Sequence, residues 1–548
     1  MLADRPPSDT SQRREGCYAA RVVASSSDSP SPSPSRTTTR AHGDAPTAPG
    51  PGPTPLFGAI PQLLRFANDS ISTVGRLFAQ YGPIVSIVRA PARVMSPTGR
   101  FVVAVNGPAL NREILTSHER YRMYALPGPY YPEESAIAHA REQAGRHGRA
   151  TAERLRPIQR TLTGLFHVNG DEHRRHRRLL QPAFNKTRID AYRDDMVALT
   201  SRMLDEWKVD EVRDVHADMT ELTLRIATKT LFGEDAGDRG VALARMMQQW
   251  LLTMFSPGML LRLDIRGLPY HRWLDLTRRI DDETAAILRE KRAAVAKRAP
   301  DGPIAADMLS MLIAARDEDG SALDEDELVG HTGVIFAAGH ETSTNALAWT
   351  LFLLAEHPQV ASDLVDELDG LLHGSPPTVE QLGKLPFLDA VVKESMRVLP
   401  PVPLHPRVVA EDHELGGHFL PAHTELFLSI FHMHHDPALF PDPDRFDPKR
   451  WSKIKPSVYE YNPFSAGPRM CIGAAFAMME IKIALAMLLQ RFRVERTPKA
   501  RIDRRVAITM APKHGVPMVI RRADGAWSAA RRSLPPVRGN VREIVILP

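Results

Sequence analysis

Apolar residues recur at helical spacing over most of the chain after residue 190, in long segments separated by Gly and Pro. This spacing places the apolar side chains on one face of an α-helix. A similar pattern runs over residues 63–81. Shorter apolar runs predict β-strands, at residues 84–88, 101–105, 425–430 and 517–520. We therefore expect a mainly α fold with small β-sheets.

The two ends of the chain differ in composition from the rest. Residues 1–49 are rich in Ser, Pro, Thr and Arg and show no apolar period, which is typical of a disordered tail. An organelle transit peptide is the alternative, but several acidic residues argue against it: Asp4, Asp9, Glu15, Asp28 and Asp44. Residues 524–548 are basic and contain Pro. We expect one folded domain over residues 50–523, between this tail and a separate C-terminal extension.

Charge, cysteine content and hydropathy argue against several classes of protein. The net charge of +5 over 548 residues is too small to indicate nucleic-acid binding. The two cysteines, Cys17 and Cys471, do not support a disulfide framework, and a reducing cytoplasm fits them better. The sequence lacks the run of about 18 apolar residues that crosses a bilayer, so we expect no membrane anchor.

The segment 464–473 reads FSAGPRMCIG and precedes a strongly apolar helical pattern at 474–490. A thiolate at Cys471 would be stabilised there by the free N–H groups of a helix N-terminus. Gly467 allows a tight turn, and Gly473 lets the backbone approach a flat ligand closely. Arg469 can pair with an anionic group on that ligand. A buried structural cysteine that opens a core helix is the alternative interpretation.

The spacing F-x-x-G-x-R-x-C-x-G is matched at every defined position: Phe464, Gly467, Arg469, Cys471 and Gly473. This segment resembles the haem-binding loop of the cytochrome P450 superfamily, and the resemblance extends over about residues 49–522. It implies the cytochrome P450 fold and haem b (iron protoporphyrin IX) as the cofactor. It also implies that Cys471 is the metal ligand, because an axial Cys thiolate distinguishes these proteins from most other haem proteins.

Residues 328–356 have the pattern of one long apolar helix, interrupted by the run AGHETS at 338–343. Glycine inside a helix costs about 1 kcal/mol relative to alanine, so Gly339 indicates a special packing need. Thr342 can hydrogen-bond a carbonyl three or four residues earlier and so open a groove. A kinked core helix is the alternative. The run resembles the oxygen-binding helix of the family, which implies that Glu341 and Thr342 deliver protons for dioxygen cleavage.

Glu394 and Arg397 stand three residues apart in the helical run DAVVKESMRV, so they share one helix face. The segment FPDPDRF at 440–446 resembles the family's P-E-R-F element, with Asp444 where Glu is common. The resemblance implies that Arg445 completes an ion network with Glu394 and Arg397. We expect this network to fix the core around the haem and not to add stability.

Other basic residues match positions that bind the haem propionates in the family. His173 and Arg177 lie four residues apart in a segment that resembles the C helix, and they share one face. Arg407 matches a position that binds the other propionate. A solvated basic face, able to receive a redox partner, is the alternative for the C helix because further arginines crowd it: Arg174, Arg175 and Arg178.

The family pattern also implies which residues surround the substrate: Val334, Ile335, Ala338, Val402, Leu404, Ile508, Thr509 and Met510. Nearly all are apolar, which favours an apolar substrate such as a terpene, a fatty acyl chain or a polyketide. One departure from the family is the long Arg-rich segment 121–167. It is either a surface insertion or a lid for a large or anionic substrate.

These features lead to three functional hypotheses. The first is a haem-thiolate monooxygenase that inserts one oxygen atom from O₂ into its substrate. Its electrons would come from a separate ferredoxin or flavodoxin with an NAD(P)H reductase, because no flavin or iron–sulfur segment is fused to the chain. The second is a haem-thiolate enzyme that does not hydroxylate, such as an isomerase or an oxidative coupling enzyme. The third is a haem sensor or electron carrier, which would have no use for the acid–alcohol pair formed by Glu341 and Thr342.

Overall fold

The computed structural model describes residues 47–89, 101–123, 149–161, 163–233, 237–254, 264–297, 307–523 and 535–547. All of them belong to one compact unit, residues 45–548. The predicted N-terminal tail, except for its last three residues, lies outside the described residues.

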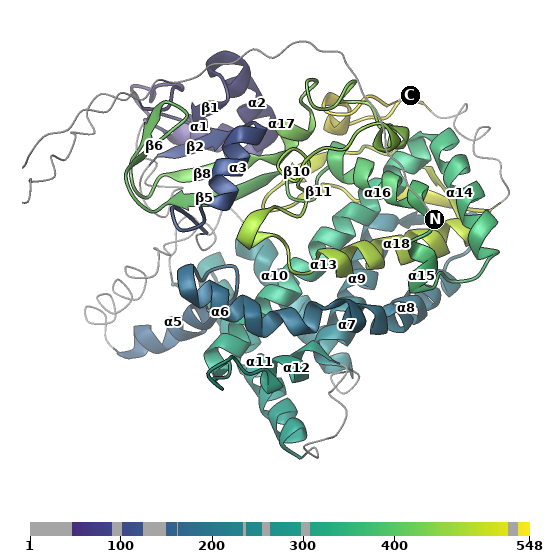
Figure 1. The fold of residues 1–548 in the computed structure, drawn as a ribbon, viewed down its shortest axis with the longest axis horizontal. Coiled ribbons are helices and arrows are strands. Elements are labelled where there is room, and N and C mark those ends of the chain that lie inside the picture. Colours follow the sequence, from purple (N-terminus) through teal and green to yellow (C-terminus); the bar gives the residue numbers. More distant parts are fainter. Residues whose placement is uncertain are drawn as a thin grey trace, which may run out of the picture. The chain divides into compact units, whose positions relative to one another are not determined.

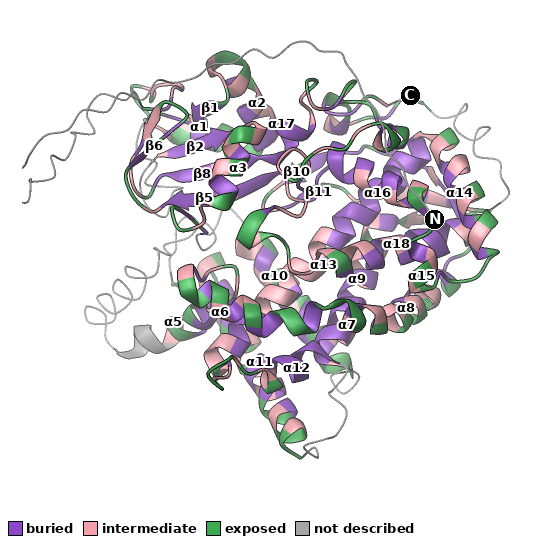
Figure 2. Cartoon of the chain, viewed as in Figure 1, coloured by how far each residue is buried: buried purple, intermediate pink, exposed green. Residues whose placement is uncertain are grey.

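The 32-residue helix α13 (Glu325–Glu356) runs through the interior (Figures 1 and 2). It begins with a capping box, in which the side chains of Asp324 and Glu327 each accept the other residue's backbone N–H. From residue 343 to residue 356 every side chain is buried. The reason is that helices pack around it: α5 (Arg149–Thr161), α9 (Val215–Phe232), α11 (Pro269–Ala296), α16 (Pro386–Val398) and α18 (Ala474–Arg491). A helix enclosed in this way has to be apolar on all sides.

The remaining helices cover this core and the main sheet. They are α1 (Ile60–Asn68), α2 (Ser70–Tyr81), α3 (Pro108–Thr116), α6 (Gly170–Leu180), α7 (Lys186–Ala191), α8 (Arg193–Asp205), α10 (Gly237–Met254), α12 (Met308–Ala314), α14 (Pro358–Leu372), α15 (Val379–Leu382) and α17 (Ile430–His434). Short 3₁₀ turns include η1 (Gln181–Phe184) after α6 and η5 (Gly467–Arg469) before α18.

The main sheet has five strands in the order β1-β2-β8-β5-β3 (Figure 1). The strands are β1 (Ile84–Ser86), β2 (Val102–Val105), β3 (Tyr121–Arg122), β5 (Leu404–Val409) and β8 (Glu425–Ser429). β2 and β8 run parallel, and the other neighbouring pairs are antiparallel. The smaller sheets are β4-β12-β9 (Val212–Asp214, Pro517–Arg522, Phe492–Arg496), β10-β11 (Arg504–Val506, Met510–Pro512) and β6-β7 (His413–Leu415, His418–Leu420).

The predicted strands at 84–88, 101–105, 425–430 and 517–520 are confirmed as β1, β2, β8 and β12. The helical pattern at 63–81 forms two helices, α1 and α2, and not one. The break lies at Asp69, whose side chain accepts the backbone N–H of Ser72 and caps α2. A capping residue inside an unbroken apolar pattern therefore divides the segment.

The prediction of a separate C-terminal extension is wrong for residues 535–547, which pack into the main hydrophobic core. Val537, Val541 and Val545 are buried there. The buried side chain of Arg496 donates to the carbonyl of Pro535 at 2.7 Å. The sequence does not reveal this packing, because the apolar residues of 524–548 follow no helical or strand period and arginines and prolines interrupt them.

Candidate active site

Cys471 lies in the loop between η5 and α18, just before the apolar helix α18 begins at Ala474. Its backbone N–H donates to the carbonyl of Phe464 at 2.9 Å and closes the loop. Gly467 has a φ of +69°, and a Cβ at this position would overlap the carbonyl oxygen of Leu115. Both the backbone conformation and the close approach therefore require glycine here.

The Cys471 thiol is free and reachable by solvent, although protein surrounds most of the residue. Burial raises the pKa of this thiol, while the backbone N–H of Gly473 and the nearby guanidinium of Arg177 act in the opposite direction. Gly473 is the N-cap residue of α18, so the N–H that faces the sulfur belongs to a helix N-terminus. The helix N–H and the basic side chain expected near the sulfur are thus present, but burial outweighs them and leaves the pKa of the thiol raised.

Arg407 lies on β5, is 4% exposed, and has no acidic partner among the described residues. Its guanidinium donates to the thioether of Met123 at 2.9 Å and to the adjacent carbonyl of Pro406. Burial lowers the pKa of Arg407 to about 10. A buried cation without a counter-charge is costly, so this site fits an anionic group that comes from outside the chain.

A second set of donors lies beside Arg407. The Arg469 guanidinium donates to the carbonyls of Leu165 and Val168 and to the Asn169 amide oxygen. The same amide oxygen accepts the N–H of Met123, whose sulfur accepts from Arg407. The loop before α6 and strand β5 are thereby joined to the Cys471 loop.

His173 and Arg177 project from α6 as their spacing predicts. His173 is buried, its Nδ1 has no hydrogen-bond partner within the described part of the chain, and burial together with Arg469 and Arg177 lowers its pKa to about 3. Arg177 donates to the carbonyl of Met470, next to the cysteine. The structure thus brings His173, Arg177 and Arg469 together, and Asn169 joins Arg407 to them.

The middle of α13 has one partly exposed face within an otherwise buried helix. Val334, Ile335, Ala338, Glu341 and Thr342 lie at helical spacing and are all half-buried. A Cβ added at residue 339 would meet nothing within 4 Å, so space is open beside the helix. The Thr342 hydroxyl donates to the carbonyl of residue 338 at 2.8 Å, as predicted. This face combines an apolar surface with the acid–alcohol pair.

Glu341 has a partner that the sequence does not indicate. The hydroxyl of Thr509, in the turn between β10 and β11, donates to Glu341 Oε1 at 2.7 Å. Thr509 was predicted to line the substrate pocket by its position in the family pattern. A contact between residues 168 positions apart has no local sequence signal.

The other predicted pocket residues fall into two groups. Val402 and Ile508 are half-buried, whereas Leu404 is buried within β5. Met510 is fully buried in the main core, and its carbonyl accepts the indole N–H of Trp349. The side chain of Met510 therefore contributes to core packing.

The ion network exists, but its third member is Arg450 and not Arg445. Glu394 is fully buried and accepts five hydrogen bonds, two from Arg397 and one each from Arg450, the Asp447 backbone and the Trp451 indole. Its ion pairs with Arg397 and Arg450 measure 2.9 and 2.8 Å.

The side chain of Arg445 is exposed, and it contributes its carbonyl oxygen, which accepts from both other arginines. The turn of residues 442–446 directs this side chain outward, because Phe446 occupies the buried position. The 3₁₀ turn η4 (Pro448–Ser452) then returns Arg450 to the carboxylate.

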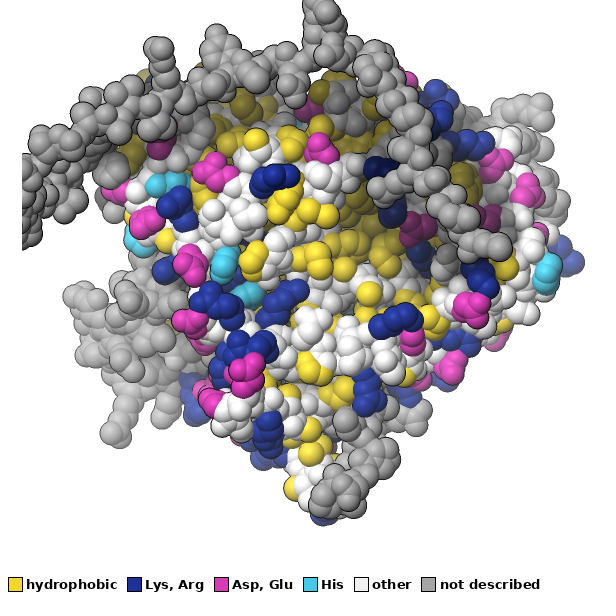
Figure 3. All heavy atoms as spheres, in the orientation of Figure 1, with side chains coloured by type: hydrophobic (Ala, Val, Ile, Leu, Met, Phe, Trp, Pro, Cys, Tyr) yellow, Lys and Arg dark blue, Asp and Glu magenta, His cyan; other side chains and the backbone are white. Residues whose placement is uncertain are grey.

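The remaining arginines of α6 are paired with acids of neighbouring segments. Arg175 binds Glu327 at 2.8 Å, Arg178 binds Asp317 at 2.9 Å, and Arg174 binds Asp171 and Glu119. Figure 3 shows the two signs of charge mixed over the face in view. A strongly basic docking face is therefore not formed by these side chains alone.

The Arg-rich segment 121–167 is described only in part, since residues 124–148 lie outside the described residues. In its C-terminal part, the buried Arg160 of α5 binds Asp281 of α11 and the acids at the start of α13, Glu325 and Asp326. Arg154 binds Asp264 at 2.7 Å. Helix α5 is therefore an integral part of the helical packing and not a surface insertion.

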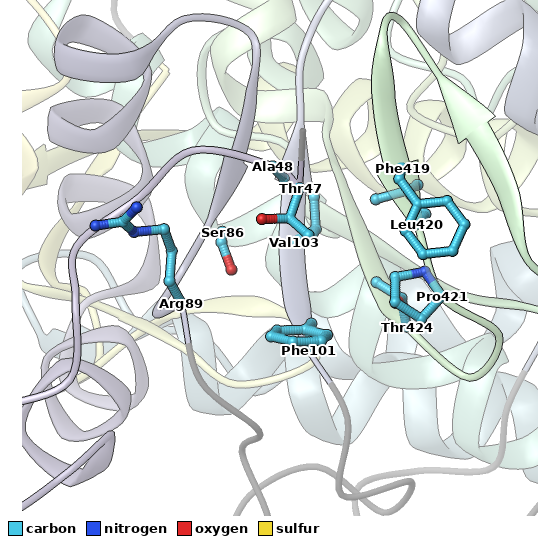
Figure 4. A pocket seen from close by; sticks show the side chains of 10 residues that line it. All are labelled: Thr47, Ala48, Ser86, Arg89, Phe101, Val103, Phe419, Leu420, Pro421 and Thr424. Carbon is cyan, nitrogen blue, oxygen red and sulfur yellow. The ribbon is translucent and has the colours of Figure 1, made fainter. Parts of the chain in front are cut away.

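A pocket apart from these residues is lined by Thr47, Ala48, Ser86, Arg89, Phe101, Val103, Phe419, Leu420, Pro421 and Thr424 (Figure 4). Arg89 is the one ionisable side chain of this set, and it points away from the others (Figure 4). The pocket contains none of the predicted site residues and offers no acid–base pair.

In the described part of the chain, no helix combines the length and apolar character needed to span a membrane.

Comparison with known proteins agrees with this geometry. The family model for cytochrome P450 matches residues 117–517. Cyclooctat-9-en-7-ol 5-monooxygenase of Streptomyces melanosporofaciens is 34% identical over 60% of this chain and 72% of that protein. Pentalenene oxygenase of Streptomyces avermitilis is 29% identical over 81% of this chain and 91% of that protein.

Among solved structures, retinoic acid bound cyanobacterial CYP120A1 matches with a TM-score of 0.70 and 25% sequence identity, over 87% of this chain and all of that one. The family match covers the Cys471 loop, helix α13 and the Glu394 network together. The chain therefore belongs to the cytochrome P450 family, the haem-thiolate monooxygenases.

Proposed function

We propose that this cytochrome P450 hydroxylates a polycyclic terpene or a closely related isoprenoid. The observation that carries this proposal is the half-buried face of α13, where the apolar side chains of Val334 and Ile335 lie beside the acid–alcohol pair. Two similar proteins are named for oxidation of cyclooctat-9-en-7-ol and of pentalenene, and a similar structure holds retinoic acid. A rigid hydrocarbon suits such a face, because it has few polar groups to satisfy.

The residues around Cys471 fit haem b. Cys471 would ligate the iron, while Arg407, Arg469, Arg177 and His173 would bind the two propionates, which supply the counter-charge that Arg407 lacks among the described residues. Gly473, where a Cβ would meet only the Phe184 ring at 3.7 Å, leaves room for a flat macrocycle. Gly467 allows the tight turn of the loop, and Phe464 closes the loop through its carbonyl. When bound, haem supplies dioxygen activation, assisted by electron donation from the thiolate.

The chain itself supplies protons and excludes unwanted water. The side chain of Thr342 is uncharged, and its hydroxyl is held in place by the hydrogen bond to the carbonyl of residue 338. The hydroxyl can therefore orient a water molecule or pass on a proton. Glu341 can exchange protons with solvent because it is only half-buried. The fully buried residues that follow, Asn345 to Glu356, close the helix to solvent.

Electrons would come from a separate ferredoxin or flavodoxin with its NAD(P)H reductase, in the reducing cytoplasm. This part of the proposal is supported by the family match, since cytochrome P450 enzymes generally take electrons from a redox partner, and by the two cysteines, which fit a reducing compartment. Arg174 and Arg178, whose side chains are the more exposed among the paired arginines of α6, can exchange their partners for acids of a docking protein, because exposed ion pairs are worth about 1 kcal/mol or less.

The test is a titration of the purified holoenzyme with pentalenene, retinoic acid and palmitic acid, following the spin-state shift of the haem spectrum. We expect a shift with the first or second compound and hydroxylated product by mass spectrometry. Ala338→Phe should abolish the shift by filling the half-buried face, whereas Ala294→Phe, on an exposed part of α11, should leave it unchanged. A shift with palmitic acid alone would contradict the isoprenoid assignment.

A further inference from the structure

The acid of helix α13 is not a free side chain. Its Oε1 atom accepts the hydroxyl of Thr509 at 2.7 Å, while Oε2 has no hydrogen-bond partner among the described residues. Thr509 is 6% exposed and Glu341 is half-buried. One carboxylate oxygen is therefore held by the protein and the other is available to water.

The turn that carries Thr509 is itself fixed on both sides. The N–H of Met510 donates to the carbonyl of Pro401 at 2.9 Å, and the carbonyl of Met510 accepts the indole N–H of Trp349 on α13. Inside the turn, the N–H of Ala507 donates to the carbonyl of Thr509. The hydroxyl thus approaches α13 from a rigid support, which is the requirement for positioning another side chain.

We propose that Thr509 is a positioning residue that holds Glu341 in the orientation needed for proton transfer beside Thr342. This inference rests on the proposed role of Glu341. A carboxylate attached by two flexible bonds to a helix samples several rotamers, and one hydrogen bond from a fixed hydroxyl selects among them. Removal of the hydroxyl should leave the acid present but poorly placed.

A polar contact lies one helical turn from Glu341, on the same face of α13. Asn345, one helical turn further along α13, is fully buried and lies 3.2 Å from Nε2 of His216. His216 is half-buried near the start of α9. Burial lowers the pKa of His216, while its hydrogen bond with Asn345 and the charges of Asp214 and Glu341 act in the opposite direction. Glu341 is therefore near enough to His216 for an electrostatic influence, and His216 is itself partly exposed to solvent.

The contact also explains why threonine, and not an apolar residue, occurs at position 509 between Ile508 and Met510. A valine has the same shape but lacks the hydroxyl. In a site that served only to enclose an apolar substrate, Thr509→Val would improve or preserve binding. In a site that positions an acid, the same change loses proton delivery.

The experiment compares the holoenzymes of the wild type, Thr509→Val, Thr509→Ser and Glu341→Gln without added substrate. Electrons are supplied by NADPH, spinach ferredoxin and its reductase, and the fraction recovered as hydrogen peroxide is measured in H₂O and D₂O. We expect Thr509→Val to raise the ratio of peroxide to water by about ten- to a hundredfold, the range that corresponds to loss of one hydrogen bond to a charged group. It should also change the solvent isotope effect, and Thr509→Ser should restore both values.

A second readout does not depend on turnover. Guanidinium unfolding of the four holoenzymes and of the double variant Thr509→Val/Glu341→Gln gives a double-mutant cycle. We expect the two changes to be non-additive, because Thr509→Val removes the donor of this hydrogen bond and Glu341→Gln replaces its charged acceptor by a neutral amide oxygen. Thr228→Val is the matched control: Thr228 is a buried threonine whose hydroxyl bonds a carbonyl within α9, so its loss should not alter the peroxide ratio.

An unchanged peroxide ratio in Thr509→Val, or strict additivity with Glu341→Gln in both readouts, would overturn the inference. Failure of every terpene to bind would contradict the proposed substrate class but would leave this result intact, since no substrate is added. If Glu341→Gln itself leaves the peroxide ratio unchanged, the proposed role of Glu341 fails first, and the inference fails with it.

Discussion

Replacement of Arg450 by methionine tests the third member of the Glu394 ion network, which was predicted from the sequence to be Arg445 and is Arg450 in the structure. The Arg450 side chain is 7% exposed and pairs with the fully buried Glu394 at 2.8 Å. It also donates to the carbonyls of Pro441, Asp442 and Arg445. Methionine preserves much of the volume but removes all of these donors.

The expected loss of stability in Arg450→Met follows from the hydrogen bonds and charges that remain around Glu394. Glu394 keeps Arg397, the Trp451 indole and one backbone N–H, but its carboxylate stays buried with one cation in place of two. Removing one partner of a buried pair costs about 3–5 kcal/mol when the other charge is left alone, so with Arg397 still in place we expect the lower end of this range, about 3 kcal/mol. Arg445→Met removes an exposed side chain, for which the expected change in unfolding free energy is within about 0.5 kcal/mol.

The assay is guanidinium unfolding followed by far-ultraviolet circular dichroism, with Arg450→Lys as a further variant. Lysine keeps the charge but cannot donate in the same forked geometry, so its loss should be intermediate. Equal destabilisation by Arg445→Met and Arg450→Met, or a loss below about 1 kcal/mol for Arg450→Met, would refute the assignment of Arg450 to the network.

Three further predictions concern single side chains. Gly467→Ala should destabilise the protein by about 1–3 kcal/mol in the same assay, because of the left-handed backbone and the overlap with Leu115. Arg407→Ala should lower haem retention, measured as haem absorbance per protein after gel filtration, since the buried guanidinium matches an anion. Burial raises the pKa of Glu480 to about 8, so its contribution to stability is full below its ordinary value of 4.5 and is lost as the pH rises through 8. The free energy of unfolding of Glu480→Gln should therefore rise relative to that of the wild type by about 1.4 kcal/mol per pH unit between pH 5 and 8, as measured by guanidinium unfolding at each pH. A difference between the two proteins that does not change with pH would contradict the raised pKa.

The sequence predicted those features that depend on local spacing. The apolar period of α13 and α18, the four strand runs and the glycine turn before Cys471 all arise from residues within a few positions of one another. The hydrogen bond of Thr342 to a carbonyl one turn earlier is of the same kind. Such features follow from backbone geometry and can be inferred without a tertiary structure.

The predictions that the structure corrects concern contacts between segments that are far apart in the sequence. Arg445 and Arg450 are both plausible partners for Glu394 by sequence, and the path of the turn between them decides which side chain is buried. The pairing of Thr509 with Glu341 depends on a turn whose position is fixed by Trp349 and Pro401. The packing of residues 535–547 depends on the core that they cover. None of these contacts leaves a periodic signal in the chain.

The most direct test of the haem-thiolate assignment is the absorption spectrum of the reduced, CO-bound protein. With Cys471 as the ligand, we predict the red-shifted Soret band of a thiolate-ligated haem, and its loss in Cys471→Ser while the circular dichroism stays that of a folded protein. An unshifted band in the wild type, or a red-shifted band that persists in Cys471→Ser, would contradict the account.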